Sequence, residues 1–139
     1  LALDLLSQGL VADSLTMNLG YAKSAGGAWV RGTATLGRTG ATNSARAIRE
    51  ATVALYDDIA LYDKPLRRIG LSMNRVREEV CLQYSFFEDP AELERERARQ
   101  RAILYIRDRY GKNAIFQGMD LLDGARTLER NAQIGGHRA

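Results

Sequence analysis

Three stretches of this chain alternate apolar residues with small polar residues, and this alternation constrains the fold more than any other feature. They cover residues 14–21, 30–37 and 65–74. In the first stretch the apolar positions are Leu15, Met17, Leu19 and Tyr21, and the polar positions are Ser14, Thr16, Asn18 and Gly20. Successive side chains of a β-strand point to opposite faces, so the alternation predicts three strands, each with one apolar and one polar face.

Two helices are predicted around these strands. The first ends near Ala12 and has apolar residues at helical spacing, namely Leu3, Leu6, Leu10 and Val11. The second is capped by Asn43, ends near Tyr62 and has one apolar face, formed by Ile48, Ala51, Leu55, Ile59 and Tyr62. This order of elements predicts an α+β sandwich of the ferredoxin-like type, with helices packed on one face of an antiparallel sheet. The first strand of that fold is missing, and we expect the chain to be a piece of a larger protein.

The polar faces of the three strands form a candidate binding surface. Their residues are Ser14, Thr16 and Asn18, then Arg31, Thr33 and Thr35, then Arg68, Ser72 and Asn74. With no bulky side chain, such a surface lets a phosphate backbone approach closely and meet hydroxyl, amide and guanidinium donors. The alternative is an ordinary solvated sheet face, but lysine and glutamate, the usual residues there, are rare in these strands. A surface that stacks unpaired RNA bases is disfavoured because the polar faces lack aromatic residues.

Two parts of the chain contain basic residues and no acidic residue. The formal net charge is only +3, from 20 basic and 17 acidic residues, which does not by itself indicate nucleic-acid binding. However, residues 31–49 contain four arginines and residues 64–77 contain five basic residues, and neither stretch has an acidic residue. The two stretches either converge on one surface or form separate solvated faces, and charge alone leaves both interpretations open.

The second half of the chain has a different pattern. Asp89 and Pro90 suit the N-cap and first position of a helix, and Gly111 suits its end, so a long helix is predicted between them. A short strand at Ala114–Phe116 and an irregular tail follow. We therefore expect a folded domain, a linker, and a C-terminal helix with its tail, covering residues 1–77, 78–89 and 90–139.

The composition excludes several classes of protein. No run of about 18 apolar residues could span a membrane, and the first residues lack the basic cluster of a secretory signal. Cys81 is the single cysteine, which fits the reducing cytoplasm, and together with the single histidine, His137, it leaves little for a zinc site or a catalytic dyad. Asp57 and Asp58 are neighbours on a predicted helix and point in different directions, so they are no magnesium-binding pair. We assign no catalytic residue and no metal ligand, and do not expect a complete enzyme.

Five segments in a fixed order carry a family resemblance. They are Ser14–Tyr21, Arg31–Leu36, Pro65–Met73, Gln83–Phe87 and the tail from Arg109, which contains RYGKNAI, LLDGA and ERNAQIGGHRA. Together they resemble the C-terminal part of a Y-family translesion DNA polymerase of the UmuC/ImpB/MucB-like branch. The resemblance covers almost the entire chain, and the order and spacing of the segments make it specific. It implies a little finger domain, which binds damaged, duplex DNA beside the polymerase active site during DNA repair.

The resemblance and the polar faces together imply which residues contact the DNA phosphates. They are Arg31, Thr33, Thr35, Thr42, Ser44, Arg67, Arg68 and Ser72. Thr42 and Ser44 match the family's turn before a helix, where hydroxyls and free N–H groups can meet a phosphate. Such contacts position a duplex without reading its sequence. The family's catalytic core, with the carboxylates that bind Mg²⁺, is absent here, so we expect polymerase activity and its Mg²⁺ in the parent protein, with that core as a partner.

A second implied site is the segment formed by Gln83, Tyr84, Ser85, Phe86 and Phe87. It resembles the peptide with which bacterial polymerases bind the β sliding clamp, commonly Gln-Leu-Ser/Asp-Leu-Phe. A short extended segment with two hydrophobic anchors and an amide suits a shallow pocket on a partner. In one alternative, Phe86 and Phe87 pack on the domain's own core. In another, the sheet is inert and the chain is a protein-interaction module that recruits its parent protein to the clamp.

Overall fold

The computed structural model describes residues 1–23, 26–37, 40–80 and 89–132. The chain divides into two compact units, Leu1–Arg97 and Ala98–Ala139. Every strand of the described residues belongs to the first unit. The domain boundaries expected from the sequence at residues 77 and 89 remain a prediction.

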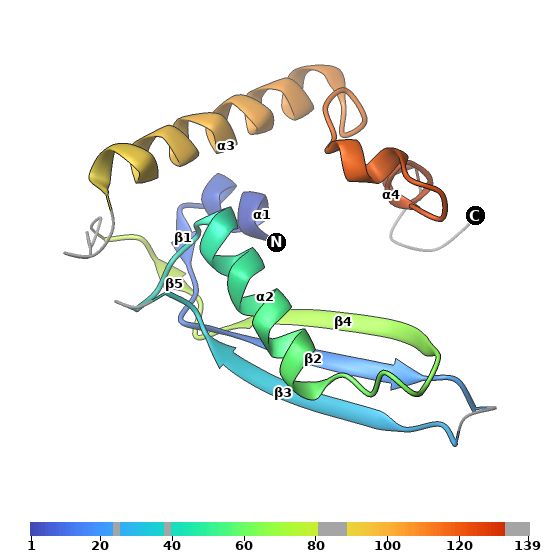
Figure 1. Ribbon diagram of the computed structural model, residues 1–139. Helices are drawn as coiled ribbons and strands as arrows, with labels where there is room; N and C mark the ends of the chain where they lie inside the picture. The colour runs from blue at the N-terminus through green and yellow to red at the C-terminus, as the bar shows by residue number, and fades with distance from the viewer. Residues whose placement is uncertain (24–25, 38–39, 81–88, 133–139) are drawn as a thin grey trace. The chain divides into compact units, whose positions relative to one another are not determined.

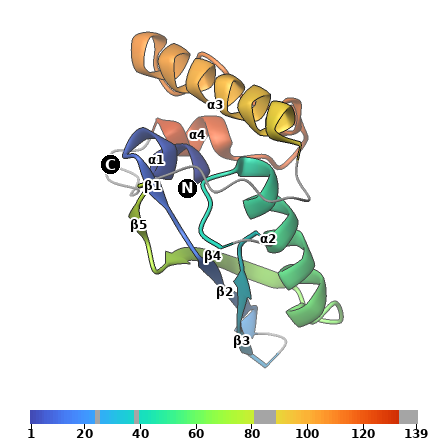
Figure 2. The same ribbon diagram turned by 90° about the vertical axis from the view of Figure 1, so that its left-hand side faces the viewer.

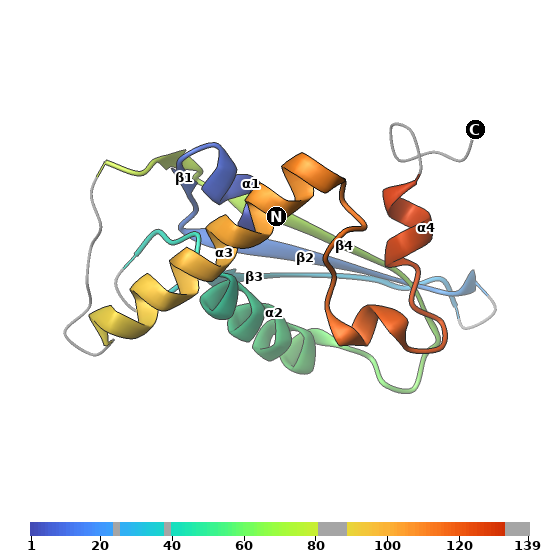
Figure 3. The same cartoon turned by 90° about the horizontal axis from the view of Figure 1, so that it is seen from above.

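Three antiparallel strands form the main sheet of the first unit (Figures 1 and 3). They are β2 (Ser14–Tyr21), β3 (Trp29–Thr35) and β4 (Leu66–Asn74), in the order β3-β2-β4. The apolar residues of the central strand are almost inaccessible to solvent, with Leu15, Met17 and Leu19 at most 1% exposed. The three alternating stretches are therefore strands, as predicted, and their apolar side forms the core.

Helix α2 (Ala45–Ile59) packs on the apolar side of the sheet, against β2 and β3 (Figure 2). Its buried residues, Ile48 and Leu55, join the core beneath it. Gly32 of β3 lies directly under the helix, because a Cβ built there would be 2.9 Å from Cδ1 of Leu55 and 3.0 Å from Cγ2 of Ile59. The missing side chain lets the helix approach the strand closely. The α+β fold, with a helix on one face of an antiparallel sheet, is confirmed and is consistent with a little-finger-like domain.

The apolar side of β4 is less well covered than that of β2 and β3. Ile69 is 53% exposed and Leu71 is 37% exposed, whereas Met73 packs against the core. The expectation that helices cover the apolar side therefore holds for the central strand and β3, and in part for β4.

The first helix is shorter than the sequence predicts. α1 covers Ala2–Ser7, and Gly9 follows it with a φ of 65°. Leu10–Val11 then forms the short strand β1, which pairs with β5 (Arg77–Glu78) in a separate two-stranded sheet. The prediction of helix up to Ala12 is wrong because so few residues cannot distinguish helical spacing from a strand. In addition, its partner strand β5 lies far along the chain, so the local sequence does not indicate the pairing.

α2 is shorter at both ends than the sequence predicts. Its N-cap is Ser44, whose Oγ accepts a hydrogen bond from the backbone N–H three residues on, at 3.2 Å. Asn43, the predicted cap, is 5% exposed and donates instead to a backbone carbonyl of β1 at 3.1 Å. The helix ends at Ile59, and Tyr62 is 70% exposed rather than part of the packed face. Asn43 is used for a long-range contact that no local pattern indicates.

Helix α3 (Pro90–Tyr110) has the predicted bounds. The carboxylate of Asp89 accepts a bond from a first-turn N–H at 2.9 Å, and Gly111 ends the helix with a φ of 92°. The predicted strand at Ala114–Phe116 is wrong, because its middle carbonyl is taken by the guanidinium of Arg107 at 3.1 Å. Two short helices follow, so this part is more regular than predicted: η2 (Gly118–Leu121) and α4 (Thr127–Asn131).

Candidate nucleic-acid interface

The strand register brings the predicted polar faces together on the side of the main sheet opposite α2. Read from β3 through β2 to β4, the rows are Thr35–Ser14–Asn74, Thr33–Thr16–Ser72, Arg31–Asn18–Gly70 and Trp29–Gly20–Arg68. We call these four rows the polar face. They contain five of the eight residues predicted to contact DNA, namely Arg31, Thr33, Thr35, Arg68 and Ser72. All five are exposed.

Hydrogen bonds between side chains order the middle of the polar face. The hydroxyls of Thr16 and Thr33 lie 3.0 Å apart, and the Asn74 amide donates to Thr16 Oγ1 at 2.9 Å. Thr16 is only 3% exposed and Ser14 only 6%, because neighbouring strands flank them on both sides. Apart from Asn18, which is partly exposed, the central strand is therefore buried on both of its faces. Most of the donors that a ligand can reach come from β3 and β4.

A β-bulge sets the direction of the arginine pair at the start of β4. Gly20 pairs with Arg68 and Tyr21 pairs with Leu66, so Arg67 is the extra residue between them. The bulge places Leu66 with the core residue Tyr21, and it places Arg68 on the polar face. Arg68 is thereby assigned to the polar face by the register. Arg67 is exposed, and its contact with DNA stays a prediction.

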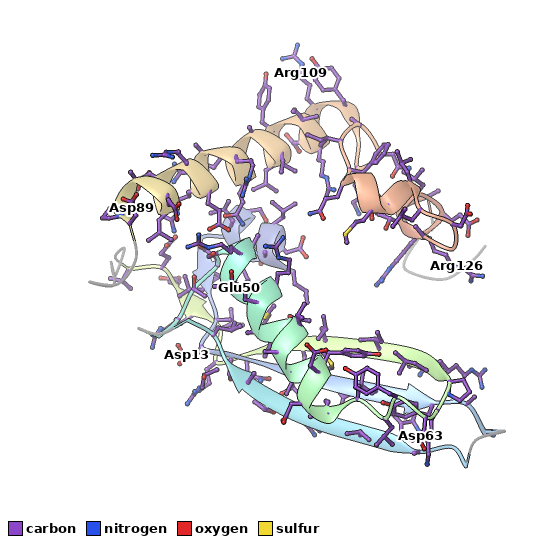
Figure 4. The ribbon with its side chains drawn as sticks, in the orientation of Figure 1. Asp13, Glu50, Asp63, Asp89, Arg109 and Arg126 are labelled. Atoms are coloured by element: carbon purple, nitrogen blue, oxygen red, sulfur yellow. The ribbon has the colours of Figure 1, made fainter. Side chains whose placement is uncertain are left out.

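Other basic residues of the two positive stretches are paired with carboxylates. Asp13, directly before β2 (Figure 4), forms ion pairs with Arg75 Nε at 3.4 Å and with Arg77 at 3.3 Å. Arg46 of α2 pairs with Glu92 at 3.1 Å, and this hydrogen bond raises the pKa of the Arg46 guanidinium. One arginine from each stretch lies on the polar face, Arg31 in β3 and Arg68 in β4. The arginines that pair with carboxylates lie outside these rows.

The N-terminus of α2, where Thr42 and Ser44 are predicted to meet a phosphate, binds a carboxylate of this chain. Glu96 accepts bonds from Ser44 Oγ at 2.9 Å and from the backbone N–H of Arg46 at 2.8 Å. Glu96 is only 8% exposed. The hydroxyl of Thr42 accepts a bond from the Ser44 N–H at 3.0 Å. Thr42 and Ser44 thus lie apart from the polar face, and their contact with DNA stays a prediction.

Trp29 is the residue of the polar face that sequence reasoning missed. It is 65% exposed, and its indole lies over Gly20, whose Cβ, if present, would be 3.0 Å from Cη2 of the ring. The expectation that the polar face lacks bulky and aromatic side chains is therefore wrong. The alternation contained the signal, because Trp29 stands two residues before Arg31 and shares its face.

Several predicted features lie outside the described residues. They are Cys81, His137, the clamp-binding-like segment Gln83–Phe87 and the tail Ile134–Ala139. Among the residues that the structure describes, no cluster of histidine, cysteine and carboxylate side chains could hold a metal ion. The same part of the chain contains no helix that is long and apolar enough to cross a membrane.

The region that holds the polar face also carries a family signature. Residues 1–86 match the impB/mucB/samB family C-terminal domain, which is more than half of the chain. The chain belongs to the impB/mucB/samB family. This confirms the resemblance to the C-terminal part of UmuC/ImpB/MucB-like Y-family polymerases.

A named relative of the impB/mucB/samB chain agrees with this assignment. The chain is 30% identical over 101 residues to DNA polymerase IV 2 of Bacillus subtilis (strain 168). The match covers 69% of this chain but 22% of that polymerase, so the chain spans about a fifth of its relative's length. No solved structure matches the chain. Glu96, which binds the N-terminus of α2, lies beyond the matched family domain.

Proposed function

We propose that this chain is the DNA-binding little finger domain of a Y-family translesion polymerase, and that its polar face binds the backbone of primer–template DNA. The observation that carries the proposal is the convergence of five exposed donors on one side of the main sheet: Arg31, Thr33, Thr35, Arg68 and Ser72. The named relative, a DNA polymerase, supports a role on DNA. The proposed role in DNA repair follows from the resemblance to translesion polymerases. This role on DNA also implies a cytoplasmic location.

The chemistry of the polar face suits phosphate groups. Hydroxyl and guanidinium groups donate hydrogen bonds to phosphate oxygens, and the four rows contain no carboxylate that would repel them. Arg31 and Arg68 stand on opposite sides of β2 and one row apart. Strand and residue spacings put their Cα atoms roughly 12 Å apart. The two guanidinium groups can therefore reach separate phosphates, which positions a duplex without reading its sequence.

The test is a titration of the 139-residue chain against a fluorescent primer–template duplex, followed by anisotropy at several salt concentrations. Binding should weaken steeply with salt and be equal for duplexes of different sequence. Arg68→Ala should reduce the slope of log K against log salt by about 0.9. Arg49→Ala is the matched control, because it removes the same charge from an exposed position on α2, away from the polar face.

Three results would contradict phosphate binding by the polar face. The first is an unchanged salt slope in Arg68→Ala, and the second is an equal change of slope in Arg49→Ala. The third is a strong dependence of affinity on the base sequence of the duplex.

We also propose that residues Gln83–Phe87 bind the β sliding clamp. The support is their sequence, in which a glutamine precedes aromatic anchors. Capture of the chain on immobilised clamp should be lost in Phe86→Ala with Phe87→Ala. If that variant is captured as well as the wild type, the segment is not the contact. Capture combined with a failure to bind DNA would favour the alternative function, a module that recruits its parent protein.

We propose further that nucleotidyl transfer and its Mg²⁺ belong to the catalytic core of the parent polymerase.

A further inference from the structure

Trp29 has an unusual position for the largest side chain of this protein. It is the first residue of β3 and is 65% exposed on the polar face, so little of it contributes to the core. Single exposed apolar residues are common on protein surfaces and need no explanation by themselves. Here, however, the indole shares a face with Arg31 and Arg68. An aromatic ring that shares a face with two cations is a combination that a solvated face does not require.

The backbone beneath the ring is shaped to receive it. Trp29 pairs with Gly20, and a Cβ at Gly20 would lie 3.0, 3.1 and 3.3 Å from Cη2, Cζ3 and Cζ2 of the indole. These distances are shorter than ordinary contacts, so any residue other than glycine would displace the ring. The benzene part of the indole therefore rests on the backbone of the central strand, while most of the residue remains open to a ligand.

The row that holds Trp29 also supplies a phosphate donor. Arg68 pairs with Gly20 from the other side, so it lies across the central strand from Trp29. Arg31 follows Trp29 by two residues on the same face. Proteins that bind single-stranded DNA combine positive side chains, which follow the backbone, with aromatic side chains, on which the bases stack. The Trp29–Gly20–Arg68 row, with Arg31 beside it, provides both groups.

We propose that Trp29 stacks on an unpaired base of single-stranded DNA, while Arg31 and Arg68 bind the flanking phosphates. The proposal rests on the proposed function and names a second ligand for the same face. An unpaired base is required because the bases of a duplex are already stacked on one another and present only their edges. The absence of carboxylates from the four described rows favours a polyanion over a basic peptide.

Intrinsic fluorescence tests the proposal directly, because Trp29 is the only tryptophan of the chain. A short oligothymidylate should quench its emission, and an abasic oligonucleotide of the same length should quench it far less. In anisotropy titrations, Trp29→Ala should lose about 5- to 150-fold in affinity for the oligothymidylate, the range expected for one stacked base. Its affinity for a blunt duplex should change less than twofold. Trp29→Phe, which retains an aromatic ring, should recover part of the loss.

The possible outcomes separate this proposal from the proposed function. If the wild type binds duplex but not oligothymidylate, or if Trp29→Ala binds both ligands as the wild type does, stacking is overturned and phosphate binding stands. Equal quenching by the abasic oligonucleotide also overturns stacking. If the wild type binds no DNA at low salt, both fail together. A thermal melt of Trp29→Ala controls for folding, and we expect it to match the wild type because the side chain is largely exposed.

Discussion

At the scale of single residues, two glycines of the main sheet give opposite predictions for the same substitution. A Cβ at Gly32 would be 2.9 Å from Cδ1 of Leu55, which is 7% exposed and cannot move freely. A Cβ at Gly70 would meet nothing nearer than 3.9 Å. In urea unfolding we expect Gly32→Ala to lose about 1–3 kcal/mol through overpacking. Gly70→Ala should be neutral or gain up to about 1 kcal/mol. Equal stability of the two variants would mean that α2 does not pack on β3 as described.

Gly20 makes a third case, because its neighbour is an exposed ring and not the core. Gly20→Ala should push the indole of Trp29 off the backbone, since the new methyl group would lie 3.0 Å from Cη2. The ring can move into solvent, so we expect a change in the tryptophan emission spectrum with a change in stability below about 0.5 kcal/mol. An unaltered spectrum would show that the ring does not rest on Gly20. If Trp29 binds an unpaired base from this position, the variant should also lose part of its affinity for oligothymidylate.

At the scale of elements, local sequence patterns predicted the features that local geometry determines, but not the features that depend on contacts between distant residues. The alternation in residues 14–21 predicted both the strand and its two faces, because strand geometry has a fixed period of two. Its burial on both faces depends on neighbouring strands, so Thr16 was expected on the surface and is 3% exposed. Asn43 reads locally as a helix cap, but it binds a carbonyl of β1 and the carboxylate of Glu79. Contacts between distant residues have no local signal.

The contact between α2 and the start of α3 gives a prediction at the same scale. Glu96 satisfies the Ser44 hydroxyl and the Arg46 N–H at the N-terminus of α2, and it is nearly buried. Glu96→Ala should therefore cost about 1–3 kcal/mol of unfolding free energy. In a double-mutant cycle with Ser44→Ala, the two losses should be less than additive. Asp108→Ala, at an exposed position of the same helix, should change stability by less than about 0.5 kcal/mol. Additive losses would show that the two side chains act independently.

At the scale of the whole molecule, the residues that stabilise the first unit and the residues proposed to bind DNA lie on opposite sides of its main sheet. The apolar side carries Leu15, Met17 and Leu19 under α2, so substitutions there should act on unfolding. The polar side carries Arg31 and Arg68, which are exposed, so substitutions there should act on affinity. Thr16 connects the two sets, because it belongs to the polar face, where its hydroxyl lies beside that of Thr33, and is nevertheless buried. The family match covers both sides, whereas α3 lies beyond it.

The C-terminal boundary of the folded domain can be tested with truncated fragments. The first unit includes α3 up to Arg97, whose guanidinium pairs with Glu79, next to β5. A fragment of residues 1–101 keeps this ion pair and the Glu96 contacts, and we expect it to melt within about 5 °C of the full chain. A fragment of residues 1–80 loses these charged hydrogen bonds, together about 2–4 kcal/mol, and should melt roughly 10–20 °C lower. Equal melting temperatures of the two fragments would place the end of the folded domain before α3, as the sequence boundary at residue 77 predicts. A lower melting temperature for the shorter fragment would make the first turns of α3 part of the folded domain.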